Sequence, residues 1–215
     1  RMTDIVAIDP GPTMSAWVVL GKDDKPWGRF ENNEVLLQRL AQPSYLNTLP
    51  DFRTSGLRAD LAQHGERGVM APACLAVEDI TNMGMAVGSD VFKTMFWSGR
   101  FCQVWSMNRN VGLRVFSQIP RPEIKLFLCG SSRAKDPNVR QALIDRYGGD
   151  EVAIGGKKCL KCKGKGWFGS GRPECKECKG GGWLQPPGPL HGFSGHTWSA
   201  LAVAVTSRHL PLPIR

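Results

Sequence analysis

Residues 4–11 read Asp-Ile-Val-Ala-Ile-Asp-Pro-Gly, and residues 16–20 read Ala-Trp-Val-Val-Leu. The first apolar run, closed by Pro-Gly, predicts a buried strand that ends in a turn, and the second predicts a strand that returns beside it. Asp9 is the last residue of the first strand. Because an unpaired acid is costly in a buried strand, Asp9 is expected to be paired, hydrogen-bonded or bound to a metal. A turn cap formed with its own backbone is the alternative.

Another buried strand with an acidic end is predicted at residues 74–80, which read Cys-Leu-Ala-Val-Glu-Asp-Ile. A strand at 27–31 completes an antiparallel meander with the first two strands. Side chains alternate along a strand, so Glu78 and Asp79 are expected on opposite faces. Glu78 ends the apolar run as Asp9 does, and we therefore expect Glu78 rather than Asp79 to join Asp9.

Helical patterns dominate the second half of the chain. Apolar residues over 89–105 recur at three- and four-residue spacing and predict a core helix, whereas Asp136 is expected to cap a helix over 137–147. The last helical pattern, over 196–209, is apolar on nearly every face, so this helix is expected to be buried against the sheet. Strands that alternate with helices predict an α/β fold around one mixed sheet.

The composition is basic: 28 Lys and Arg stand against 19 Asp and Glu, a net charge of +9 over 215 residues. This excess predicts a polyanionic partner, although charge alone does not separate nucleic acid from an acidic membrane surface. No apolar run approaches the ~18–20 residues of a membrane span, and no basic amphipathic helix favours a membrane surface. We therefore expect no membrane partner. The first residues do not resemble a signal peptide, which predicts a cytoplasmic protein.

Two copies of the pattern Cys-x-x-Cys-x-Gly-x-Gly stand at residues 159–166 and 175–182, and Trp follows each copy. Paired Cys-x-x-Cys turns can close a tetrahedral site for structural Zn²⁺, here with Cys159, Cys162, Cys175 and Cys178 as ligands. Two disulfides are the alternative, which a reducing cytoplasm disfavours. The repeat resembles the zinc-binding Cys-rich region of the DnaJ chaperone family, with two turns here in place of four.

The cysteine region is strongly basic and follows a Gly-rich segment over 148–156, which is expected to be a linker. Between residues 157 and 179, eight basic residues stand against two acids. The basic residues include Lys161, Lys163 and Lys165. This local charge favours contact with a phosphate backbone, and a merely solvated surface is the alternative.

Five features then occur in order along the chain: Asp9-Pro10-Gly11, Glu78, Lys125, Lys135, and the segment His-Thr-Trp-Ser-Ala-Leu-Ala at residues 196–202. Together they resemble the RuvC family of Holliday-junction resolvases, in particular the divergent RuvC-like proteins of bacteriophages. The resemblance implies an RNase H-like fold, a homodimer, and a metal-dependent endonuclease. Such an enzyme resolves four-way (Holliday) or otherwise branched DNA junctions by phosphodiester hydrolysis with Mg²⁺ or Mn²⁺. A phage-encoded member acts in the cytoplasm of its bacterial host.

Carried over by position, the resemblance makes Asp9, Glu78 and His196 the ligands of the catalytic metal and adds Lys135 to the catalytic set. DNA contacts are expected from Lys125, Arg133, Lys135, Met83 and Met85, besides the three lysines of the cysteine region. Met83 and Met85 match the place of an apolar wedge at the junction centre. For these two methionines a plain mobile loop is the alternative.

The resemblance also divides the chain into a nuclease core over 2–156, an inserted zinc module over 157–183, and the rest of the core over 184–215. One ligand position departs from the family pattern, because Ser199 stands where Asp is expected. Three interpretations stay open: a weakened metal site, another ligand such as His191, or an introduced change. The alternative function is a junction-binding protein with weak or no cleavage. A DnaJ-like cochaperone would need a His-Pro-Asp signature, which the sequence lacks.

Overall fold

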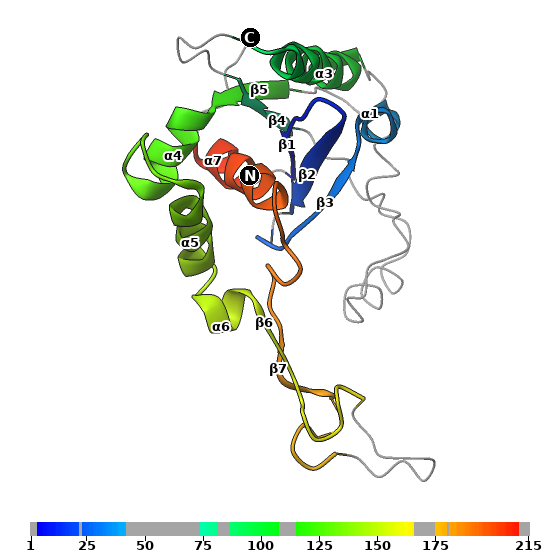
Figure 1. The fold of residues 1–215 in the computed structure, drawn as a ribbon, viewed down its shortest axis with the longest axis vertical. Helices are drawn as coiled ribbons and strands as arrows, with labels where there is room; N and C mark the ends of the chain where they lie inside the picture. Colours follow the sequence, from blue (N-terminus) through cyan, green and yellow to red (C-terminus); the bar gives the residue numbers. More distant parts are fainter. Residues whose placement is uncertain are drawn as a thin grey trace.

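A five-stranded mixed sheet forms the centre of the computed structural model (Figure 1). The structure describes residues 4–21, 23–41, 74–80, 87–107, 115–165, 175–179 and 181–210. The strands are β1 (Ile5–Asp9), β2 (Met14–Leu20), β3 (Pro26–Asn32), β4 (Cys74–Asp79) and β5 (Val115–Pro120), in the order β3-β2-β1-β4-β5. Strands β1 to β3 form the predicted antiparallel meander, and β4 and β5 run parallel to β1. The single mixed sheet that was expected is confirmed.

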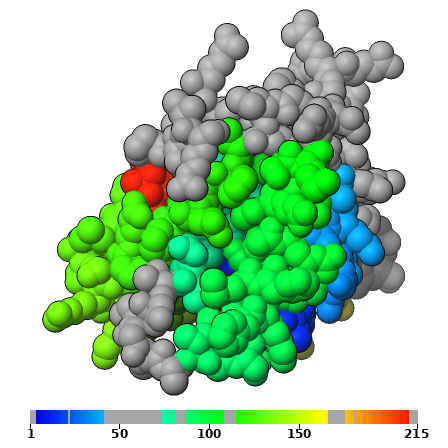
Figure 2. Space-filling model, turned by 90° about the horizontal axis from the view of Figure 1, so that it is seen from above, coloured from blue at the N-terminus to red at the C-terminus, as the bar shows by residue number. Residues whose placement is uncertain are grey.

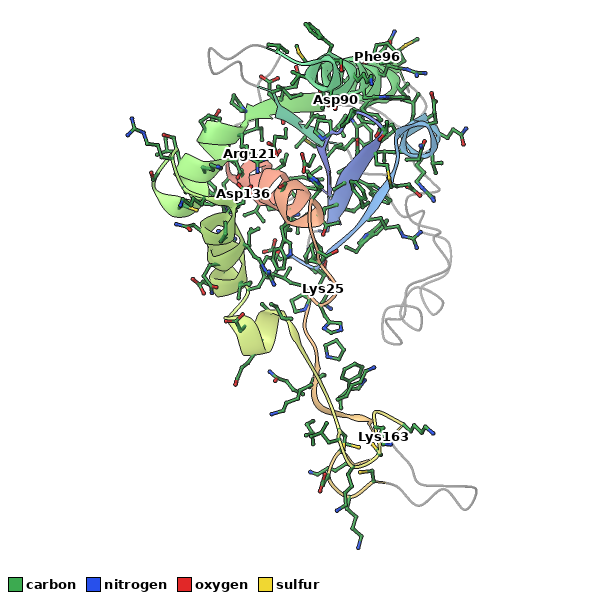
Figure 3. The ribbon with its side chains drawn as sticks, viewed as in Figure 1. Lys25, Asp90, Phe96, Arg121, Asp136 and Lys163 are labelled. Atoms are coloured by element: carbon green, nitrogen blue, oxygen red, sulfur yellow. The ribbon has the colours of Figure 1, made fainter. Side chains whose placement is uncertain are left out.

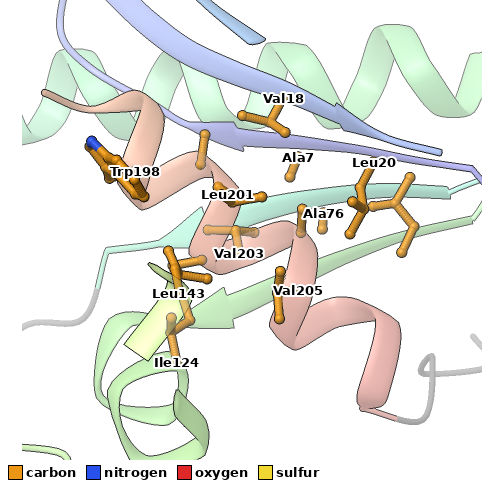
Figure 4. Close-up of a cluster of buried hydrophobic side chains, with 14 of the residues drawn as sticks. Ala7, Val18, Leu20, Ala76, Ile124, Leu143, Trp198, Leu201, Val203 and Val205 are labelled. Atoms are coloured by element: carbon orange, nitrogen blue, oxygen red, sulfur yellow. The ribbon is translucent and has the colours of Figure 1, made fainter. Parts of the chain in front are cut away.

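Helices cover both faces of the sheet. Helix α7 (Thr197–His209) packs across one face, while α1 (Asn33–Ala41) and α3 (Ser89–Met107) lie on the other. Figure 4 shows the apolar side chains between α7 and the sheet, with Leu201 and Val203 among them. Both are fully buried, and so are Ala7 and Ala76 on the facing strands, whose small side chains allow a close approach of helix and sheet. The predicted burial of this last helix is confirmed.

The two faces of the sheet divide the strand residues by alternation. Ala7 of β1 and Ala76 of β4 pack toward α7, whereas their neighbours Ile8 and Val77 pack toward α1 and α3. Odd positions of β1 and even positions of β4 therefore face α7. This arrangement puts the acids at the ends of both strands on the α7 face, and it turns Asp79 to the opposite face.

The remaining elements lead away from the sheet. They are α4 (Arg121–Cys129), α5 (Asp136–Arg146), α6 (Asp150–Ala153), β6 (Gly155–Lys158) and β7 (Trp183–Pro187). Strands β6 and β7 pair antiparallel and carry the cysteine region at the end of an arm (Figure 1). The prediction of a linker over 148–156 is wrong, because α6 and the start of β6 occupy it. A Cβ on Gly155 would lie 2.2 Å from the carbonyl oxygen of Pro186, so this glycine permits close strand pairing.

Helix α3 differs from the core helix that its periodicity predicts. Its inner face is buried through residues such as Phe101 and Trp105, but Phe92, Met95 and Phe96 are 63%, 52% and 60% exposed. Apolar residues lie on more than one side of this helix, and a helical period alone does not say which side meets the sheet. Among the described residues, no helix is long and apolar enough to cross a membrane.

Candidate active site and zinc module

Asp9 ends β1 on the α7 face and is 8% exposed. Its Oδ2 lies 3.0 Å from Nδ1 of His196, the residue that immediately precedes α7. The turn after β1 is held by other groups, since Ser15 accepts a hydrogen bond from the Gly11 amide and Asn33 donates one to the Gly11 carbonyl. The contacts of Asp9 are therefore those of a site residue rather than of a turn cap.

Glu78 reaches the same place from β4. The parallel register pairs Ile8 with Val77, so the next residue of each strand, Asp9 and Glu78, follows side by side on the α7 face. Glu78 is 7% exposed, and its Oε1 accepts a hydrogen bond from Nη1 of Arg121 at 2.7 Å. Two buried carboxyl groups thus lie beside each other at the ends of β1 and β4, and the exposed imidazole of His196, before α7, contacts one of them, Asp9. Among the described residues, only the four cysteines of the arm form a compact group of three or more such ligands.

The surroundings of the two acids disfavour their charged forms. Burial raises the pKa of Asp9, and contacts with His196, Arg121 and Ser199 offset this only in part. Burial also raises the pKa of Glu78, and the nearby negative charge of Asp9 raises it further. A bound divalent cation would stabilise both charged carboxylates, since hard cations prefer oxygen ligands. The residue types and their convergence therefore fit a Mg²⁺ or Mn²⁺ site.

Sequence reasoning missed two members of this site, Arg121 and Asp136, which lie side by side in Figure 3. Nη2 of Arg121 lies 2.9 Å from Oδ1 of Asp136, and Nζ of Lys125 lies 3.4 Å from the same oxygen. The predicted cap role of Asp136 is wrong, because Lys135 is the N-cap of α5 and no side chain caps this helix end. The hydrogen bond from Arg121 lowers the pKa of Asp136.

The other expected site residues lie at different distances from this centre. The Lys125 side chain is 19% exposed and contacts Asp136, which links it to Arg121. Arg133 and Lys135 are exposed on the segment between α4 and α5. Ser199 lies one helical turn after His196 and is near enough to Asp9 to lower the pKa that burial raises. His191, named as a substitute ligand, instead contacts Trp183 at the arm, with ring centroids 6.1 Å apart. Met83 and Met85 lie outside the described residues.

A second constellation stands at the end of the arm, where four cysteine sulfurs lie within 4.8 Å of one another. The Sγ atoms of Cys159 and Cys175 are 3.7 Å apart, and those of Cys162 and Cys178 are 3.6 Å apart. Sulfurs at the ~2.3 Å zinc–sulfur distance of a regular tetrahedron lie about 3.8 Å apart. All four thiols are unbridged, unlike the disulfide alternative. The cluster therefore fits one Zn²⁺ with no open position.

The two cysteine turns repeat one backbone geometry. Lys163 and Lys179 each follow the second cysteine of their turn, and both have left-handed backbones, with φ of 51° and 47°. The amide of Gly182 donates to Sγ of Cys178 at 3.3 Å, as expected for a metal-binding turn. Nζ of Lys161 lies 3.2 Å from Oε1 of Glu177, which joins the two turns across the cluster. Figure 3 shows Lys163 at the far end of the arm.

No protein-family model matches the sequence, and no curated protein does either. Among solved structures, one of Thermus thermophilus RuvC is similar, with 16% identity and a TM-score of 0.47 over 94% of this chain and 92% of that chain. Another holds T. thermophilus RuvC in complex with a Holliday junction substrate, with 16% identity and a TM-score of 0.44 over 95% and 92%. At these values the assignment of a function rests on the site residues.

Proposed function

We propose that this protein is a metal-dependent endonuclease that hydrolyses phosphodiester bonds in four-way or otherwise branched DNA. The observation that carries the proposal is the convergence of Asp9, Glu78 and His196 on one face of an RNase H-like sheet. Buried acids at the ends of adjacent strands are rigidly held, which metal-assisted hydrolysis requires. The basic composition and the resemblance of the site segments to RuvC proteins support DNA as the substrate.

Asp9, Glu78 and His196 would hold the catalytic metal, with Mg²⁺ or Mn²⁺ as the ion. When bound, a divalent ion lowers the pKa of a water nucleophile and stabilises the leaving oxygen. The carboxylates keep their positions because β1 and β4 are buried in the sheet, and His196 is held by Asp9 and by stacking on Phe30, with centroids 5.6 Å apart. An imidazole ligand makes Mn²⁺ acceptable beside Mg²⁺.

Contacts with the DNA backbone come from two basic regions. Near the site, Lys125 lies on α4, and Arg133 and Lys135 lie on the segment that follows it. The resemblance to RuvC proteins assigns Lys135 a contact beside the cleaved phosphate. On the arm, Lys163 and Lys165 are accompanied by Lys161. We assign residues 2–156 and 184–215 to the nuclease core and 157–183 to a zinc-binding insertion that extends the DNA-binding surface.

A homodimer fits this function, because a four-way junction offers two strands to cut and a two-fold dimer places one site at each. The exposed apolar face of α3 is the surface that we assign to the dimer. Phe92, Met95 and Phe96 lie at four- and three-residue spacing on one side of the helix, and Figure 2 shows α3 on the outer surface. Isologous contact between two copies of this face would remove these side chains from water.

A second candidate function is junction binding with weak or no cleavage. Two observations favour it: Ser199 supplies a hydroxyl to Asp9 where the family has a carboxylate, and Arg121 already pairs with Glu78. Both reduce the negative charge available to metal. The binding surfaces named above do not depend on these residues, so binding would persist without cleavage.

One assay separates the two candidates. A labelled four-way junction and a linear duplex of the same sequence are incubated with the protein in Mg²⁺, in Mn²⁺ and in EDTA. The proposed function predicts cuts in the junction alone and only with metal. Junction binding without cuts, together with cleavage by the Ser199→Asp variant, would support the second candidate.

A further inference from the structure

Arg121 contacts two acids, one of them the buried Glu78 of the site. Its guanidinium bridges two carboxylates from different elements, with Nη1 2.7 Å from Glu78 and Nη2 2.9 Å from Asp136. The Pro120-Arg121-Pro122 segment fixes the start of α4 directly beyond β5, so the residue is anchored by the backbone. A guanidinium that makes two such contacts stays charged at any physiological pH.

We propose that Arg121 permanently supplies one of the positive charges that the site needs at Glu78, so that the site takes one divalent ion where a two-metal nuclease takes two. The inference deepens the proposed function and rests on it. Asp9 and His196 would hold this ion, with Glu78 beside Asp9 on the neighbouring strand. Arg121 is thereby a positioning residue, since it acts through Glu78 and Asp136.

The balance of charge among the described side chains suits one divalent ion rather than two. The carboxylates of Asp9, Glu78 and Asp136 exceed the positive charges of Arg121 and Lys125 by one. One divalent cation reverses this small excess, whereas a second would face a surplus of positive charge held in a partly buried site. Lys125 touches Asp136 but has no described contact with Glu78.

Ser199 points to the same conclusion independently. The resemblance to RuvC proteins places an acid one helical turn after His196, whereas this chain has the hydroxyl of Ser199 there. A serine hydroxyl is a neutral and weaker ligand than a carboxylate for Mg²⁺. The chain thus lacks one acidic ligand of a second metal site and pairs another, Glu78, with a guanidinium. Both features weaken the binding of a second metal ion.

The test counts Mn²⁺ ions rather than turnover. The full chain with its zinc module loaded is titrated with MnCl₂ in the absence of DNA, and free Mn²⁺ is followed by its electron paramagnetic resonance signal. We expect one Mn²⁺ per wild-type chain and none for Asp9→Asn. Arg121→Gln combined with Ser199→Asp frees both carboxylates and adds the missing acid, so this double variant should raise the count to two, whereas Ser199→Asp alone and Arg121→Lys with Ser199→Asp should keep it at one. Lys25→Gln removes one positive charge at the opposite end of the sheet from Asp9, and as the matched control it should also give one.

The outcomes are distinguishable. Two Mn²⁺ per wild-type chain would overturn the inference and leave the proposed nuclease intact. One Mn²⁺ for both the wild type and the Arg121→Gln, Ser199→Asp double variant, with unchanged circular dichroism, or two for Ser199→Asp alone, would equally overturn the role of Arg121. No Mn²⁺ on the wild type would remove the catalytic metal site, and the inference with it. The charge-keeping Arg121→Lys, Ser199→Asp variant guards against a change in the count that comes only from altered folding.

Discussion

Replacing Phe96 with Glu should break the dimer that we assign to α3. Phe96 is 60% exposed, and a phenylalanine presents about 200 Å² when fully accessible, so its exposed part is about 120 Å². At about 25 cal/mol per Å², its burial contributes about 3 kcal/mol in each protomer. Because an isologous interface holds two copies, the Phe96→Glu change removes about 6 kcal/mol, or roughly 10⁴-fold in the dimer dissociation constant.

Sedimentation velocity over a range of protein concentrations measures this constant directly. The control is Leu160→Glu, which places the same charge on an 83% exposed apolar residue of the zinc arm, far from α3. The wild type and the control should dimerise equally, and Phe96→Glu should sediment as a monomer. An unchanged dissociation constant for Phe96→Glu, or a wild type that is monomeric at all concentrations, would refute the assignment of this face.

Three further predictions concern the zinc module and the acids of the site. Elemental analysis of protein purified without added metal should find close to one Zn²⁺ per chain, and Cys175→Ser should lose it; absent zinc with four titratable thiols would contradict the fit of the cluster. Replacing Lys161, Lys163 and Lys165 with Ala should reduce the slope of log K against log[salt] by up to about 0.9 per lost contact on duplex DNA, whereas Lys25→Ala on the core should leave it unchanged. The folded-state pKa values of Asp9 and Glu78 are raised, so the metal-free folded protein binds protons at these groups more tightly than the unfolded chain does. The free energy of unfolding should therefore fall as the pH rises from about 4, the pKa of an unfolded carboxyl, through the raised values. Thermal unfolding in EDTA should show a smaller loss for Asp9→Asn than for the wild type, and Mg²⁺ should reverse the loss in the wild type alone; equal curves would contradict the placement of the acids.

The sheet and the position of its two acids followed from elementary periodicity. An apolar run closed by Pro-Gly, with an acid as its last residue, leaves few options besides a buried strand that ends at a site. Two-residue alternation separated Glu78 from Asp79, and the position of Glu78 at the end of the apolar run, like that of Asp9, selected it. The packing of β4 puts Glu78 on the α7 face and Asp79 on the other. The burial of α7 followed equally from apolar residues on nearly all of its faces.

The parts that were missed depend on contacts between elements distant in sequence. Arg121 and Asp136 meet because α4 and α5 pack together, and no local pattern announces an ion pair across two helices. Periodicity correctly predicted that α3 is a helix, but the side that faces the sheet is decided by the neighbouring strands. Gly155 looked like part of a flexible linker, yet its lack of a side chain serves close strand pairing.

The comparison of Glu78→Gln with Asp79→Asn tests the central claim most directly. These residues are adjacent on β4, but Glu78 faces α7 and Asp79 faces the opposite side of the sheet. Single-turnover cleavage of a four-way junction in Mg²⁺ should fall on the order of 10³-fold for Glu78→Gln, equivalent to about 4 kcal/mol of the barrier, with little change in junction affinity. Asp79→Asn should cut at the parental rate. A Glu78→Gln protein that cuts as fast as the wild type, or an Asp79→Asn protein that does not cut, would contradict an active site at this end of β1 and β4.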